Sequence, residues 1–129
     1  MIQSIEKRRY KRYLPPEGTV ALVGEPLTIL GTIMDLSESG LSFRYIQKRR
    51  QPFELSQLDI LYTDKLIYID HIPFRAVSDI EIPCITSSRL FRLRRCGIQF
   101  KDLTDRQTYL LKNLIRNHAK NLYKINSYL

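Results

Sequence analysis

The chain has 129 residues, a formal net charge of +8 and a sequence pI of about 9.7, and this is the length of one domain that can bury its own core. Hydrophobic residues make up 43% of the sequence and charged residues 26%, which excludes wholesale disorder. The excess of Lys and Arg predicts an anionic partner: nucleic acid, anionic lipid or a phosphate-bearing ligand.

The N-terminal segment is basic and is predicted to be a mobile arm. Lys and Arg crowd its first 12 residues, and Pro-Pro-Glu-Gly at positions 15–18 then interrupts any regular structure. The segment lacks the apolar core of a signal peptide, and no apolar run in the chain approaches the roughly 20 residues of a membrane span. We therefore divide the chain into an arm, residues 1–17, and one folded domain, residues 18–129, and expect a cytoplasmic protein with no membrane insertion.

The part between Thr19 and Phe100 has the alternating pattern of β-strands. Leu41, Phe43 and Tyr45 alternate with polar neighbours and predict a strand with one buried face. Other candidate strands lie at 19–23, 27–34, 53–62, 66–80 and 90–100.

Two irregularities are expected in these strands. Pro73 has no backbone N–H and marks a sheet edge or a bulge. Near Arg94 and Arg95 the apolar residues change from odd to even positions. Because a slip of one residue turns side chains to the opposite face, we expect a bulge there or two short strands.

The C-terminal segment changes to a helical period. Thr104 and Gln107 match the two ends of a capping box. Leucines at helical spacing follow, so we predict an amphipathic helix over about 104–123. Short antiparallel strands that end in one helix suggest a small closed barrel with the helix packed on it.

No catalytic or metal-binding pattern is visible in the sequence. Cys84 and Cys96 fit no zinc or redox spacing, and His71 and His118 lie far apart. We interpret the thiols as reduced, with one disulfide as the alternative. Nucleophile-elbow, P-loop and zinc-protease motifs are absent. The sequence therefore predicts no catalytic residue, no metal, no cofactor and no enzymatic activity.

Two short motifs stand out by their order and spacing. Arg8 and Arg12 form an R-x-x-x-R pattern in the arm. After 22 intervening residues, Asp35, Ser37 and Gly40 form a D-x-S-x-x-G pattern between two predicted strands. Taken alone, the first pattern is typical of a solvated tail and the second of a hairpin turn.

Taken together, the two motifs resemble those of the PilZ family of cyclic di-GMP receptors. The sequence CGIQFKDLT at 96–104 is also similar to the last strand of that family and the start of its helix, and the resemblance spans residues 6–117. It implies a six-stranded antiparallel PilZ-type β-barrel with a C-terminal α-helix and a flexible basic N-terminal arm. It also implies a bacterial second-messenger receptor whose ligand is cyclic di-GMP. The implied ligand-binding residues are Arg8, Arg9, Arg12, Asp35, Ser37 and Gly40.

The chemistry of these residue types suits that ligand. The planar fork of an arginine matches phosphate oxygens and the O6 and N7 edge of guanine, and its face stacks on a purine. The Asp35 carboxylate can accept from the guanine N1–H and N2 amine. Ser37 offers a hydroxyl, and Gly40 can adopt a positive φ that lets the ligand approach the backbone.

The arm offers a way to relay the signal. Its like charges repel without ligand, and a dianionic ligand held between arm and barrel would order it. The resemblance implies a downstream protein partner, whose identity the sequence does not give. Arg9 adds a third cation to the motif.

Other interpretations remain open at this point. A small basic barrel that binds nucleic acid is the main alternative, although the Asp35 carboxylate in such a groove would repel phosphates, so nucleic acid is not the expected partner. A third interpretation is a barrel that has lost its ligand and serves as a protein-contact module. The basic cluster that contains Arg94 and Arg95 is either a solvated strand edge or the rim of the ligand site.

Overall fold

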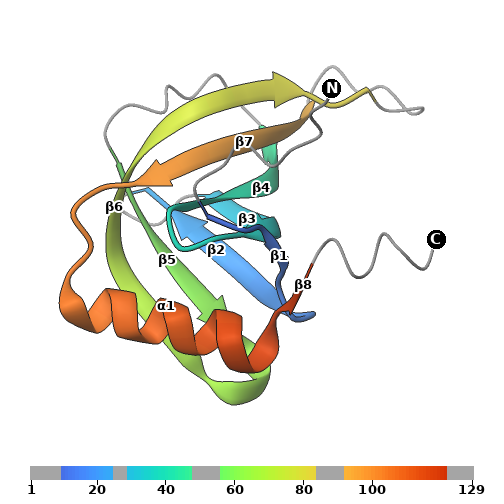
Figure 1. Ribbon diagram of the computed structural model, residues 1–129. Helices are drawn as coiled ribbons and strands as arrows, with labels where there is room; N and C mark the ends of the chain where they lie inside the picture. Colours follow the sequence, from blue (N-terminus) through green and yellow to red (C-terminus); the bar gives the residue numbers. More distant parts are fainter. Residues whose placement is uncertain (1–9, 25–28, 48–55, 84–91, 122–129) are drawn as a thin grey trace, which may run out of the picture.

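The computed structural model describes residues 10–24, 29–47, 56–83 and 92–121. Six strands follow the hydrogen-bonded order β2-β5-β6-β7-β4-β3, and a further pairing of β2 with β3 closes the ring (Figure 1). All of these pairings are antiparallel. The predicted six-stranded barrel is therefore confirmed. Its strands are β2 (Thr19–Val23), β3 (Ile29–Leu36), β4 (Gly40–Gln47), β5 (Ser56–Tyr62), β6 (Ile67–Glu81) and β7 (Arg92–Phe100).

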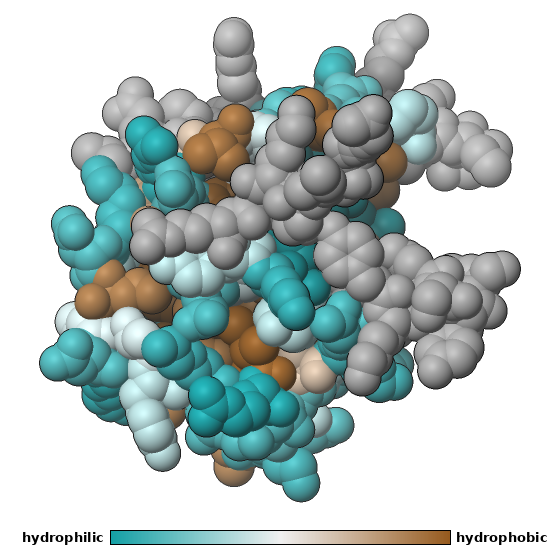
Figure 2. All heavy atoms as spheres, viewed as in Figure 1, coloured by the Kyte–Doolittle hydropathy of each residue, from teal (hydrophilic) through white to brown (hydrophobic). Residues whose placement is uncertain are grey.

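The barrel interior is filled by the inward-facing residues of the alternating strands. On β4, Leu41, Phe43 and Tyr45 are 0%, 0% and 3% exposed, whereas Arg44 between them faces solvent. Each such apolar side chain stabilises the fold by about 1.5–3 kcal/mol relative to leaving it in water. On the face of the molecule in Figure 2, hydrophilic residues lie over the helix, and apolar residues show between them and the strands above.

Two very short strands extend the sheet beyond the barrel. β1 (Tyr13–Leu14) pairs with β3 through Tyr13 and Leu36, and β8 (Lys120–Asn121) pairs with β1. The end of the basic arm and the chain that follows the helix thus lie side by side next to β3 (Figure 1). The arm is consequently not loose over its whole predicted length, because backbone hydrogen bonds hold its last part to the barrel.

The predicted break near Arg94 and Arg95 is wrong. β7 pairs with β4 without interruption from Arg92 to Gln99, and the register shift lies on the neighbouring strand β6, between Ala76 and Ser78. Cys96 and Ile98 of β7 are buried and Phe100 packs against the core, and Arg94 follows this phase because it has an ion-pair partner in Asp79. Because Arg94 is charged, the sequence pattern predicted an outward-facing residue at a position that faces inward.

Pro73 does not mark a sheet edge. β6 pairs with β5 at Gln57 and Pro73 and with β7 from Phe74 onward, so the strand has neighbours on both sides. The bulge lies a little earlier, between Ile69 and Ile72, where His71 has a φ of 56°. Pro73 therefore lies next to the point at which the pairing of β6 with β5 ends and its pairing with β7 begins.

A polar network closes the barrel near Arg94. The Arg94 Nε donates to Asp79 Oδ1 at 3.0 Å, and the buried Tyr45 hydroxyl donates to the same carboxylate at 2.9 Å. Cys96 is a buried free thiol next to this network. Burial, with a smaller contribution from Asp79, raises the pKa of Cys96 to about 12. The Cys96 thiol is therefore protonated and unreactive near neutral pH, while Cys84 lies outside the described residues.

The helix α1 (Asp105–His118) covers one end of the barrel (Figure 1). The predicted capping box is confirmed, since Thr104 Oγ1 accepts from Gln107 N at 3.1 Å and Gln107 Oε1 accepts from Thr104 N at 2.9 Å. The helix ends at His118, earlier than the predicted 123, because Ala119 is extended and leads the chain into β8. This helix, the single α-helix of the described ranges, is too short and too polar to cross a membrane.

Gln107 joins the helix to the barrel, and its replacement by methionine is expected to destabilise the fold by about 2 kcal/mol. The side chain is 7% exposed, and its Nε2 donates to the backbone carbonyls of Asp70 at 2.9 Å and His71 at 3.0 Å. Methionine keeps the volume but leaves these carbonyls and Thr104 N without partners. Urea unfolding measures the loss.

The matched control for this prediction is Thr104→Ala, which removes the cap alone and should cost about 1 kcal/mol. If Gln107→Met were no less stable than Thr104→Ala, the bonds from Gln107 to β6 would contribute nothing to stability.

Candidate functional site

A carboxylate held between two arginines lies on the outer face of the barrel. Arg12 Nη1 donates to Asp35 Oδ1 at 2.8 Å, and Arg95 Nη2 donates to Asp35 Oδ2 at 3.2 Å. Arg95 Nη2 also donates to Ser42 Oγ at 3.0 Å. The side chains of Arg12 and Asp35 are 22% and 13% exposed, so this pair is screened less than a surface ion pair. We call Arg12, Asp35 and Arg95 the Arg–Asp–Arg cluster.

The structure brings together residues from both sequence motifs. Arg12 and Asp35 are 23 positions apart in the chain and form a direct ion pair. Of the two arginines considered for the rim, Arg95 joins the cluster, whereas Arg94 is turned toward Asp79. The predicted residues Arg8 and Arg9 lie outside the described residues.

The surroundings of the cluster are short of hydrogen-bond acceptors. Arg44 on β4 stands directly across from Arg95 on β7, and like charges opposite one another destabilise a sheet. Within the described ranges, Arg44 forms no hydrogen bond or ion pair, and the buried Arg12 Nε has no hydrogen-bond partner. A buried donor without a partner costs about 1–3 kcal/mol. An anion at this face would relieve both costs.

Short residues lie on the sheet beside the cluster. Asp35, Ser42, Gly97 and Ser78 are neighbours across four strands, β3, β4, β7 and β6. Gly97 has no side chain, and Ser42 is folded under Arg95. These short side chains form a strip across the sheet beside Arg95, and Ser78 Oγ lies 2.6 Å from the position that a Cβ at Gly97 would take.

Ser37 is engaged in the turn between β3 and β4, and its contact with the ligand stays a prediction. It is 1% exposed, its Oγ accepts from the backbone N–H of Ser39 at 3.1 Å and of Gly40 at 3.2 Å, and its own N–H donates to the Gly40 carbonyl at 2.8 Å. These bonds close the turn between β3 and β4, the hairpin turn 37–40. The Ser37 hydroxyl therefore bonds within the turn, two residues after Asp35 in the chain.

The expected positive φ at Gly40 is not found, since the positive-φ glycines of the described ranges are Gly18 and Gly24. Glycine is required at position 40 for a different reason. A Cβ at Gly40 would lie 2.1 Å from the carbonyl oxygen of Ile98 on β7. Gly40 therefore allows two strands to come close together, which places β4 and Arg44 beside Arg95.

Arg44 was not among the predicted site residues. Its outward position follows from the alternation of β4, but its place across from Arg95 depends on the register of β4 with β7. Within the described part of the chain, no group of His, Cys, Asp and Glu side chains is arranged to hold a metal ion.

Of the comparisons with known proteins, only the comparison of structures gave matches. No protein-family model and no curated protein sequence matches the chain. The PilZ domain of YcgR from Escherichia coli, solved with c-di-GMP, is similar with a TM-score of 0.66 and 14% sequence identity over 95% of this chain and 97% of that one. MrkH, described as a c-di-GMP-dependent transcription regulatory factor, is similar with a TM-score of 0.59 and 15% identity, and the match covers 86% of this chain but 50% of MrkH.

These similarities establish the fold. The six-stranded barrel, the helix at its end and the order of the strands are those of a PilZ domain, and the predicted PilZ-type fold is confirmed.

Proposed function

We propose that this chain is a receptor for cyclic di-GMP. The observation that carries the proposal is the Arg–Asp–Arg cluster, in which Arg12 of the first motif and Asp35 of the second meet on the outer face of a PilZ-type barrel. The structural similarity to the PilZ domain of YcgR, which was solved with c-di-GMP, supports this proposal.

The charge at the cluster fits a dianionic ligand. Arg12 and Arg95 both donate to the single carboxylate of Asp35, and Arg44 stands across from Arg95 on the same face, so two positive charges are in excess. Cyclic di-GMP carries one negative charge on each of its two phosphates. A phosphate oxygen would also supply the acceptor that Arg12 Nε lacks.

The guanine bases would be recognised by the same residues. A guanine that lies over Gly97 can present its N1–H and N2 amine to Asp35 and its O6 and N7 edge to an arginine fork. Asp35 already accepts from both arginines, and carboxylate oxygens have the lone pairs to accept a further donor each. Arg8 and Arg9 remain predicted contacts of the ligand.

The position of Arg12 gives the ligand a route to the rest of the molecule. Arg12 directly precedes β1, which pairs with both β3 and β8. A ligand that takes hydrogen bonds from Arg12 would therefore change how the arm and the chain after the helix are held. We propose that this change alters a protein-contact surface and that the chain acts as a binding module without catalysis.

Arg12→Ala is expected to weaken cyclic di-GMP binding at least tenfold, because it removes a charge-assisted contact to phosphate and one of the two arginine partners of Asp35. Calorimetric titration measures the affinity, and circular dichroism verifies that the barrel is folded. Lys11→Ala is the matched control, since Lys11 is exposed and carries the same charge one residue away. Equal losses in the two variants would show that general charge attraction, and not the Arg–Asp–Arg cluster, binds the ligand.

A further inference from the structure

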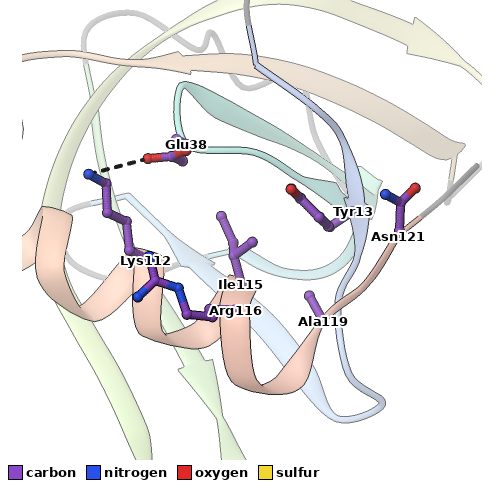
Figure 3. A pocket seen from close by; sticks show the side chains of 7 residues that line it. All are labelled: Tyr13, Glu38, Lys112, Ile115, Arg116, Ala119 and Asn121. Carbon is purple, nitrogen blue, oxygen red and sulfur yellow. Dashed lines mark ion pairs between the residues drawn. The ribbon is translucent and has the colours of Figure 1, made fainter.

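A pocket separate from the Arg–Asp–Arg cluster lies between α1, the hairpin turn 37–40 and the two short strands (Figure 3). Its volume is about 440 Å³, which is within the range of small-molecule sites. The walls come from three parts of the chain that are distant in sequence: β1, the hairpin turn, and α1 with the β8 strand that follows it. Of the described residues that were expected to bind cyclic di-GMP, Arg12, Asp35, Ser37 and Gly40, none lines it.

The floor of this pocket is apolar. Ile115, which is 8% exposed, points into it from α1, and Ala119 lies beside it where the helix ends (Figure 3). A hydrated inorganic ion gains nothing from such a floor, whereas a ligand with an apolar body removes both surfaces from water.

The rim of the pocket carries an uncompensated positive charge. Lys112 and Arg116 are one helical turn apart on the same face of α1. Lys112 Nζ lies 3.7 Å from Glu38 Oε1, and the side chains are 52% and 40% exposed, so this pair is weak. Arg116 has no hydrogen bond or ion pair with any residue that the structure describes.

A second donor faces the pocket from the opposite wall. The half-buried Tyr13 on β1 directs its hydroxyl toward the cavity (Figure 3), and this hydroxyl has no hydrogen-bond partner within the described ranges. Arg116 and Tyr13 therefore both offer donors to the pocket, and Glu38 is the carboxylate of its lining, beside Lys112. Two positive charges, Lys112 and Arg116, against this one negative charge leave the lining with a net charge of +1.

We propose that this pocket binds a small organic monoanion, a carboxylate attached to a flat apolar body. One net positive charge at the rim matches one negative charge on the ligand. The fork of Arg116 fits the two oxygens of a carboxylate, the Tyr13 hydroxyl can donate to one of them, and the body of the ligand rests on Ile115 and Ala119. This site is independent of the cyclic di-GMP receptor function proposed above.

The probe is 2-naphthoate, and 2-naphthamide serves as a neutral ligand of the same shape. In a ¹H–¹⁵N NMR titration of the full chain, 2-naphthoate should give saturable shifts in the amides of Tyr13, Glu38 and the last turns of α1. The amide analogue should bind at least tenfold more weakly. Equal binding of the two compounds, or shifts centred on Asp35 and Arg95, would overturn the proposal.

Three variants distinguish the effect of the Arg116 charge from the effect of the pocket volume on binding. Arg116→Ala should weaken 2-naphthoate at least tenfold, whereas Arg106→Ala, which removes the same charge from the other end of α1, should not. Ala119→Leu should also abolish binding, because it fills the pocket and keeps every charge. The amide spectrum of each variant verifies its fold. Unchanged binding in Arg116→Ala and in Ala119→Leu would place the probe elsewhere and refute the site.

Discussion

Replacement of Asp35 by alanine is expected to weaken cyclic di-GMP binding at least tenfold, or about 1.4 kcal/mol, without weakening the binding of a simple polyanion. Asp35 is the acceptor proposed to read the guanine edge, and it holds both Arg12 and Arg95 in place. Without it, three arginines stand on one face with no carboxylate between them. The positive potential at that face rises, and with it the attraction for any chain of phosphates.

Two titrations separate these effects: calorimetry with cyclic di-GMP, and fluorescence anisotropy with a labelled single-stranded oligonucleotide of mixed sequence. Asp64→Ala is the matched control, because Asp64 is exposed in the 3-10 turn Thr63–Lys65 and its loss changes the net charge equally. This control should leave cyclic di-GMP affinity unchanged. If Asp35→Ala weakened both ligands by the same factor, guanine reading would be refuted and the nucleic-acid-binding alternative favoured.

Gly40→Ala is expected to destabilise the barrel by about 3 kcal/mol or more, with a decrease in Tm of roughly 10 °C. The added Cβ would lie 2.1 Å from the Ile98 carbonyl oxygen. That atom belongs to the backbone of β7, which cannot move aside without losing its pairing with β4. The Phe100 N–H, which donates to the Ser39 carbonyl at 2.9 Å, would be displaced as well.

Thermal and urea unfolding followed by circular dichroism measure this loss. Ser39→Ala is the matched control, because it changes the same turn but removes only a 3.2 Å contact with Ser37 Oγ. It should cost less than about 1 kcal/mol. A Gly40→Ala variant as stable as Ser39→Ala would mean that the close approach of β4 and β7 is not required for the fold.

The elements of this fold are largely readable from the sequence, because each depends on a local pattern. β2 occupies the predicted 19–23, and the capping box of α1 lies at Thr104 and Gln107. Features that depend on pairing between distant strands were harder to predict from the sequence. The inward position of Arg94 is stabilised by Asp79 across the sheet, and the end of α1 is set by the pairing of β8 with β1.

In the site too, local patterns were readable from the sequence and long-range contacts were not. The motifs indicated Arg12 and Asp35, but their contact and the addition of Arg95 depend on the register of β3, β4 and β7. Ser37 and Gly40 shape the hairpin turn 37–40 and its packing on β7, which the motif did not indicate, and their contacts with the ligand stay predictions. A motif gives residue types at a spacing, and packing decides which of them face solvent.

Calorimetric titration of the purified chain with cyclic di-GMP at physiological salt, with cyclic di-AMP in parallel, tests the receptor function most directly. Adenine has no N1–H for Asp35 and presents an amine where guanine presents O6, so its binding would leave polar groups without partners. We expect saturable binding of cyclic di-GMP that is at least tenfold tighter than that of cyclic di-AMP. The absence of binding to either nucleotide, or equal binding of both, would contradict a cyclic di-GMP receptor.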